Sequence, residues 1–194
     1  MSHTIYNTEA FILSSRSSGE ADKTFVLFTK DFGIVSAKAT SIRKAESKVR
    51  FSVQDFRYAD VSLVKGKTIW RLISARPIHD LNSVKSLSAP ARIRSLQLVA
   101  KLGPREEPLT NLFEELVGAY TFSSRIHPKK NDMESLEALL ALKILHALGY
   151  WGEDQGDREL VRSVFNEESI GKISTVRRSI VAELNKSLRA THLM

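Results

Sequence analysis

The sequence contains no cysteine. This absence excludes disulfide bonds and zinc sites with thiolate ligands, and it fits a reducing compartment. Long apolar runs are also missing: the most apolar stretch, residues 136–151, is interrupted by Glu137 and Lys143 and is shorter than the about 20 residues that span a bilayer. Residues 1–8 have neither the basic nor the apolar part of a signal peptide. We therefore expect a cytoplasmic protein that has no membrane association, no metal and no other cofactor.

Recognisable catalytic motifs are absent as well. The five histidines are scattered, without the spacing of metal ligands. Residues 66–68 resemble the end of a P-loop, but Val61 stands where such a loop has its first glycine. Glu20 and Asp22 form a close acidic pair, which we interpret as two carboxylates in a turn because no nucleophile or base is evident beside them. The sequence thus predicts no enzyme, no catalytic residue and no small-molecule substrate.

Positive charge is present in excess and is unevenly distributed. The chain has 29 Lys and Arg against 22 Asp and Glu, a net charge of +7. Residues 1–80 hold 13 basic and 8 acidic side chains, whereas residues 81–194 hold 16 and 14. A basic excess favours encounters with polyanions, chiefly nucleic acid or anionic lipid.

The first part of the chain has the pattern of short strands. Between residues 34 and 40, Val35, Ala37 and Ala39 alternate with polar residues, the period of a half-buried strand. Similar runs, rich in β-branched and aromatic residues, occupy residues 10–14, 24–29, 53–64 and 68–75. Hairpin turns are expected at residues 30–33 and 65–67. Five short strands favour a small closed barrel of the OB type, with an SH3-like barrel as the alternative.

The second part has the period of helices. One apolar stripe runs from Leu109 to Tyr120, and an almost entirely apolar helix is predicted over residues 133–148, with Asn131 as its cap and Gly149 at its end. A last stripe consists of Val176, Ile180, Leu184 and Leu188. The sequence predicts an α+β protein with an N-terminal OB-type domain at residues 1–80 and an α-helical domain at residues 81–194.

The densest basic cluster lies in the expected loop between the third and fourth strands. Its five basic residues face a single acid, Glu46, and they are the predicted phosphate contacts: Lys38, Arg43, Lys44, Lys48 and Arg50. Four aromatic residues near this loop could stack on bases if they faced outward: Phe51, Phe56, Tyr58 and Trp70. We interpret these aromatic residues as core, because a small barrel needs large interior side chains.

Several segments, in this order, resemble the RecO family. They are residues 19–22, 27–29 and 33–37, then Arg43, Lys44 and Ser47, then Gln54 and Phe56, and in the second part Leu145, residues 148–150 and residues 188–193. The resemblance implies an OB-fold followed by a helical domain, without catalytic residues. It also implies binding and annealing of single-stranded DNA in recombinational repair, with loading of RecA and with RecR and SSB as partners.

Three departures from the family pattern stand out. Residues 40–41 are Thr-Ser where the family often has Lys-Gly, so we expect Lys38 to replace one phosphate contact. Asp55 stands where a proline is usual, and the four-cysteine zinc site of many members is absent. Charge and fold class alone equally allow an RNA-binding OB protein, and a protein-interaction scaffold acting through the helical domain is a third hypothesis.

Overall fold

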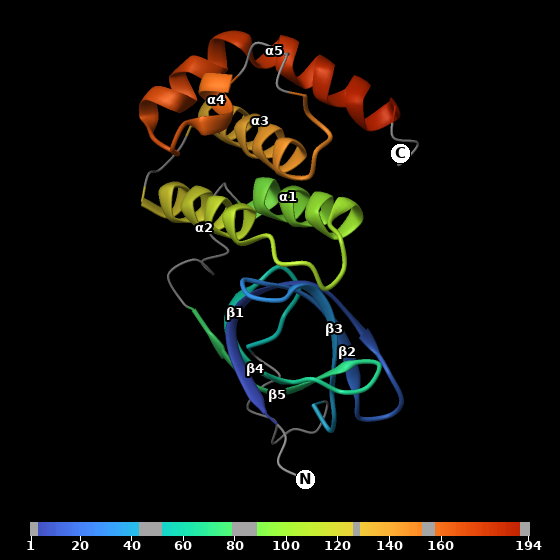
Figure 1. Ribbon diagram of the computed structural model, residues 1–194. Helices are drawn as coiled ribbons and strands as arrows, with labels where there is room; N and C mark the ends of the chain where they lie inside the picture. The colour runs from blue at the N-terminus through green and yellow to red at the C-terminus, as the bar shows by residue number, and fades with distance from the viewer. Residues whose placement is uncertain (1–3, 43–51, 79–88, 126–128, 153–157, 191–194) are drawn as a thin grey trace. The chain divides into compact units, whose positions relative to one another are not determined.

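The structure is a computed structural model that describes residues 4–42, 52–78, 89–125, 129–152 and 158–190. Within these residues, five strands are followed by five helices (Figure 1). The chain divides into two compact units, the strand unit of residues 1–82 with 103–113 and the helical unit of residues 83–102 with 114–194. The order of elements confirms the predicted α+β class. The division into domains at residues 1–80 and 81–194 stays a prediction about which parts fold independently.

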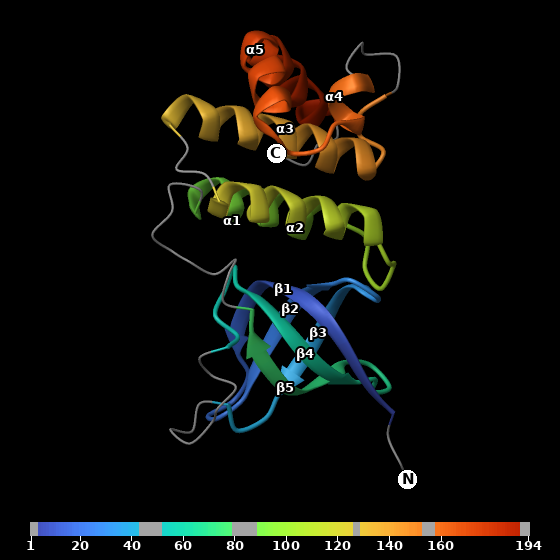
Figure 2. The same cartoon turned by 90° about the vertical axis from the view of Figure 1, so that its left-hand side faces the viewer.

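The five strands form a closed barrel (Figure 2). They are β1 (Ile5–Ser17), β2 (Lys23–Thr29), β3 (Gly33–Ala39), β4 (Tyr58–Val64) and β5 (Trp70–Pro77), arranged in the order β1-β2-β3-β5-β4. The pairing is antiparallel except between β3 and β5, which pair in parallel. Strand β1 closes the ring because its 13 residues are long enough to pair with β4 through residues 5–11 and with β2 through residues 10–17. The OB-type barrel expected from the sequence is confirmed.

Alternate side chains of each strand fill the barrel. Phe25, Leu27 and Val35 are fully buried there, and Trp70 is 3% exposed. The Trp70 ring packs against the rings of Tyr6 and Phe32, with centroids 5.7 Å and 5.0 Å away. Val35, Ala37 and Ala39 of β3 are buried in the same core, and the residues between them are exposed or half-buried, as the alternation predicted.

A second aromatic cluster lies on the outside of β1, β2 and β4. Phe11 stacks on Tyr58 at 4.7 Å, and Phe113 packs against Phe11 and Phe28 at 5.1 Å and 5.4 Å. The core interpretation is confirmed for Trp70, which lies inside the barrel. Tyr58 is also buried, but on the outside of the barrel, and Phe56 is half-buried. Phe51 lies outside the described residues.

The turn between β2 and β3 requires glycine. Gly33 has a φ of +65°, and a Cβ atom at this position would lie 2.0 Å from the carbonyl oxygen of Glu107. The N–H of Glu106 donates a hydrogen bond of 3.0 Å to the carbonyl of Ile34, which fixes the approach of this neighbouring segment. Residues 103–113 therefore pack with the barrel, although they come after the strand region in the sequence.

Strand β4 is shorter than expected. The sequence predicted a strand over residues 53–64, but β4 begins at Tyr58. Phe56 adopts a left-handed conformation with φ of +63° that interrupts the extended chain. Its N–H donates to the carbonyl of Ile12 at 2.7 Å, so the irregular segment is still attached to β1.

The helices are α1 (Ala89–Leu102), α2 (Thr110–Arg125), α3 (Lys130–Ala147), α4 (Arg158–Arg162) and α5 (Glu167–Ala190). The N-cap position of α3 is Lys129 and not Asn131 as predicted, and the Lys129 N–H donates to the carboxylate of Asp132 at 3.1 Å. Gly149, with φ of +77°, follows the C-cap Leu148 and ends the helix as expected.

One residue of the apolar stripe predicted for α5, Val176, does not face the core. Val176 is 41% exposed, whereas Ile173 and Ile180 are buried. Arg177 occupies the turn between these two isoleucines, and its guanidinium donates to the carbonyl and side chain of Asn131 at 3.0 Å and 2.8 Å. The prediction was wrong at Val176 because the neighbouring Arg177, and not Val176, faces α3, where it makes polar contacts with Asn131.

The helical unit contains a buried cation. The Lys143 side chain is 2% exposed and forms an ion pair of 3.0 Å with Glu115. Its ammonium also donates to the carbonyl of Val161 at 2.8 Å and lies 5.3 Å from the ring centroid of Phe165. The lysine that interrupts the apolar sequence of α3 thus connects that helix to α2 and to the end of α4.

Candidate nucleic-acid interface

One of the five predicted phosphate contacts lies in the part of the chain that the structure describes. Lys38 is on β3, whereas Arg43, Lys44, Lys48 and Arg50 lie outside the described residues. Ile42, directly before that segment, and Val53, shortly after it, are 3% and 4% exposed and belong to the barrel core. We call residues 43–50, which contain these four predicted contacts, the basic segment. The chain therefore enters and leaves the basic segment from the barrel core.

Lys38 points outward in a row of side chains that crosses four strands. In the strand register, Arg16 of β1 is opposite Thr24 of β2, and Thr24 is opposite Lys38. Lys38 is in turn the partner of Arg71 of β5. Neighbouring strands lie about 4.8 Å apart, and register partners point to the same face. We call Arg16, Lys38 and Arg71 the basic row.

The two arginines of the basic row are exposed. Among the described residues, neither Arg16 nor Arg71 has an ion-pair partner within 4 Å. Guanidinium groups suit phosphate because their planar donors can bind two oxygens at once. The row therefore offers two available guanidinium groups beside the strand end that leads into the basic segment.

Lys38 differs from the arginines because an acid compensates its charge. The Lys38 ammonium lies 2.9 Å from one carboxylate oxygen of Asp22, and the other oxygen accepts the Ser41 N–H at 2.9 Å. The Ser41 N–H, and after it the Lys38 ammonium, lower the pKa of Asp22 below its usual value. Ser41 is left-handed with φ of +56°, so Asp22 holds the chain in this conformation just before the basic segment. Asp22 lies in the turn between β1 and β2 as the sequence indicated, but its contacts with Lys38 and Ser41 were not predicted.

Strand β5 carries further exposed side chains beside the basic row. Ser62 is paired with Ser74 and Leu63 with Leu72, so Ile73 is an extra residue in a β-bulge. As a result Ile73 and Ser74 are both exposed, between the exposed Arg71 and Arg76.

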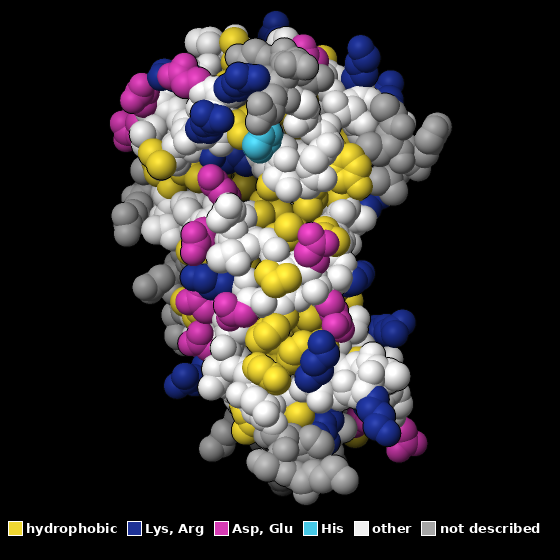
Figure 3. Space-filling view, viewed as in Figure 1, with side chains coloured by type: hydrophobic (Ala, Val, Ile, Leu, Met, Phe, Trp, Pro, Cys, Tyr) yellow, Lys and Arg dark blue, Asp and Glu magenta, His cyan; other side chains and the backbone are white. Residues whose placement is uncertain are grey.

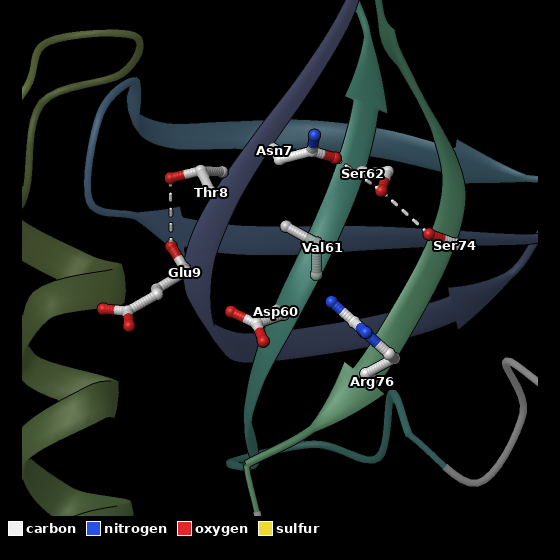
Figure 4. A pocket seen from close by; sticks show the side chains of 8 residues that line it. All are labelled: Asn7, Thr8, Glu9, Asp60, Val61, Ser62, Ser74 and Arg76. Atoms are coloured by element: carbon white, nitrogen blue, oxygen red, sulfur yellow. Dashed lines mark hydrogen bonds between the residues drawn. The ribbon is translucent and has the colours of Figure 1, made fainter.

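A polar hollow of about 250 Å³ lies on the outer face of β1, β4 and β5 (Figure 4). Ser74 donates to Ser62, and Ser62 donates to the side-chain oxygen of Asn7, each at 2.8 Å. The hollow is also lined by Glu9, Asp60 and Arg76. Two carboxylates against one guanidinium make this surface a poor place for a phosphate. Acidic and basic side chains are also mixed on the molecular face seen in Figure 3.

Two predicted absences can be compared with the described part of the chain. In residues 4–42, 52–78, 89–125, 129–152 and 158–190, no group of three or more His, Asp or Glu is arranged to hold a metal ion. Over the same residues, no helix combines the length and apolarity needed to cross a membrane.

Sequence reasoning missed Arg16 and Arg71. Both lie in runs expected to be strands or adjoin them, and each is an isolated basic residue between apolar or hydroxyl side chains. Only the register brings them into line with Lys38, because the pairing of β3 with β5 joins distant parts of the chain. The alternation of apolar and polar residues in β5 could have identified Arg71 as outward-facing. It could not have shown that Lys38 lies beside Arg71.

Comparison with known proteins adds a family to this geometry. Residues 1–81 match the family model described as "Recombination protein O N terminal". The chain is 30% identical over 151 residues to the DNA repair protein RecO of Desulfitobacterium hafniense (strain DSM 10664 / DCB-2), covering 75% of this chain and 52% of that protein. It is also 30% identical over 152 residues to the DNA repair protein RecO of Alkaliphilus metalliredigens (strain QYMF), covering 76% and 58%. The chain thus spans little more than half the length of these curated relatives.

Proposed function

We propose that this chain, which belongs to the RecO family, binds and anneals single-stranded DNA in recombinational DNA repair. The contacts would be made by the basic row together with the predicted residues of the following segment: Arg43, Lys44, Lys48 and Arg50. The role is that of a non-enzymatic mediator in the cytoplasm.

The observation that carries this proposal is the alignment of three basic side chains across the outer face of an OB-type barrel. Arg16, Lys38 and Arg71 stand in one register row. In OB-folds the face of the second and third strands commonly binds oligonucleotides, and this row crosses both strands. A groove of positive charge that follows the phosphates is the usual basis of single-strand binding without sequence preference.

The finer steps of the proposal rest on the family. We propose that the chain helps to load RecA onto single-stranded gaps and that RecR and SSB are its partners. Annealing of complementary oligonucleotides coated with SSB tests binding, partner tolerance and activity together. Annealing of naked strands without annealing of SSB-coated strands would argue against the SSB partnership alone.

A fluorescence titration with a labelled oligonucleotide at several salt concentrations tests the DNA contacts. Each phosphate contact on single-stranded DNA contributes a slope of about −0.7 to the dependence of log affinity on log salt. Replacing Arg16 or Arg71 by Ala should therefore weaken binding and make the slope less negative by about 0.7. Arg105→Ala is the control, because Arg105 is exposed in the same unit but beside Ile34, at the other end of β3.

The same titration covers the predicted segment and the rival functions. The five predicted residues account for a slope of roughly −3.5 if all of them neutralise phosphates: Lys38, Arg43, Lys44, Lys48 and Arg50. With Arg16 and Arg71 the expected slope is roughly −4.9. Unchanged affinity after Arg43, Lys44 and Lys48 are replaced by Glu would contradict that assignment. A clear preference for RNA over a matched DNA strand would favour the RNA-binding hypothesis. Lack of binding to any nucleic acid at low salt would favour the scaffold.

A further inference from the structure

We propose that Ile73 is a base-contacting residue, which packs against a nucleobase while Arg71 holds a neighbouring phosphate of the same strand. This inference rests on the proposed binding of single-stranded DNA and adds to it the residue that contacts the bases. The ligand group is the flat apolar face of a base, without regard to its hydrogen-bonding edge.

The β-bulge gives Ile73 its position. Leu72 and Ala75 fill the barrel, so in a regular strand the residues between them would alternate between core and solvent. The extra residue turns Ile73 outward together with Ser74, and Ile73 is 49% exposed. Bulges commonly re-aim a side chain near a functional site.

A single exposed apolar side chain is common on protein surfaces and carries no conclusion by itself. The neighbours of Ile73 make it different. Arg71, two residues earlier on the same strand, is exposed and belongs to the basic row. An apolar contact next to a phosphate contact matches the alternation of bases and phosphates along a single strand.

The aromatic residues of the barrel cannot take this role from the outer face of β5. Trp70 is buried in the barrel and Tyr58 is buried in the outer aromatic cluster. Within the described strands each aromatic side chain is buried or half-buried. Among the described residues of the barrel, Ile73 is therefore the large exposed apolar side chain two residues from Arg71 of the basic row.

Two probes separate base contacts from phosphate contacts: a labelled oligothymidylate, and an abasic strand of the same length. Ile73→Ala should weaken binding of the oligothymidylate about three- to fivefold, because roughly half of an isoleucine side chain loses its contact. It should leave the salt slope unchanged, since no phosphate contact is lost. Affinity for the abasic strand should also stay the same.

The control is Val176→Ala. Val176 is 41% exposed on α5 of the helical unit, whereas Ile73 and the basic row belong to the strand unit. This variant should bind both strands like the unaltered chain. Ile73→Thr, which keeps the β-branched shape that strands favour, should show a loss similar to that of Ile73→Ala.

The results separate this inference from the proposed function. If Arg71→Ala weakens binding while Ile73→Ala and Ile73→Thr do not, the inference is wrong and the proposed function stands. An equal loss of affinity for both strands on Ile73→Ala would also overturn it, because the contact would then not be with bases. If the unaltered chain binds neither strand, the proposed function fails and the inference fails with it.

Discussion

The carboxylate of Asp22 lies 2.9 Å from the ammonium of Lys38. Through its second oxygen it also accepts the N–H of Ser41, two residues before the predicted basic segment begins. Asp22 thus has two effects on the candidate interface. It positions the chain that leads into the basic segment, and it compensates part of the charge that a phosphate would use.

Asp22→Asn should tighten binding of single-stranded DNA by about two- to fivefold at low salt. The amide oxygen of asparagine can still accept the Ser41 N–H, but it carries no charge, so Lys38 becomes available to a phosphate. Anisotropy titration with a labelled oligonucleotide measures the change. Asp22→Ala, which also loses the contact with Ser41, distinguishes the two effects. Weaker binding by Asp22→Asn would mean that the carboxylate mainly positions Lys38.

The pKa of Asp22 should be measurably lower than its usual value of 3.8. A carboxyl group with a lowered pKa in the folded protein contributes stability above its unfolded pKa and loses it as the pH falls through the folded value. The contacts with Ser41 and Lys38 are therefore expected to persist at neutral pH and to break only below pH 3.8. Carboxyl-carbon NMR detects this titration. In the Lys38→Ala variant the pKa of Asp22 should rise only part of the way to 3.8, because the hydrogen bond from the Ser41 N–H lowers it more than Lys38 does. A rise to the full usual value would show that Lys38 is the larger cause.

Gly33→Ala should destabilise the strand unit by at least about 2 kcal/mol, because a side chain in the left-handed region is strained and Cβ would clash with a backbone carbonyl. That clash is with Glu107, whose oxygen would be 2.0 Å away. Gly171→Ala is the matched control in α5, where nothing lies within 4 Å of the added carbon. It should stabilise the protein by about 0.5–1 kcal/mol through helix propensity. Urea unfolding measures both changes, and equal effects would contradict the steric argument.

Glu115→Gln should destabilise the helical unit more than Lys143→Met. The first change leaves the buried ammonium of Lys143 without its counter-charge, while the second replaces it with an apolar side chain of similar length. The cost of Glu115→Gln should be about 2 kcal/mol, below the full cost of breaking a buried pair because the Glu115 side chain is 38% exposed. Lys143→Met should stay within about 1 kcal/mol of the unaltered chain. Urea unfolding followed by helical circular dichroism measures both losses of stability. A larger loss for Lys143→Met than for Glu115→Gln would contradict this explanation.

Much of the fold was predictable because local patterns report local structure. The alternation from Val35 to Ala39 predicted β3, which spans Gly33–Ala39. Gly149 predicted the end of α3, and the stripe from Leu109 to Tyr120 predicted α2. Burial periodicity and turn chemistry act over a few residues, so the sequence contains them directly. The misplaced cap of α3 and the exposed Val176 show where polar contacts between elements override these patterns.

The class of this protein follows from the pattern of residues along the chain: a strand region with most of the excess positive charge, followed by helices, without cysteine. The tertiary structure decided which charges lie together. Lys38 and Arg71 became neighbours through the parallel pairing of β3 and β5, and a bulge in β5 turned Ile73 outward beside Arg71. Asp22 acquired Lys38 and Ser41 as partners through the antiparallel pairing of β2 with β3, in which Lys23 is opposite Ala39. In a hairpin the turn and the apolar alternation set the register, but the pairing of β3 with β5, which are not consecutive in the sequence, depends on how the whole barrel closes around its core.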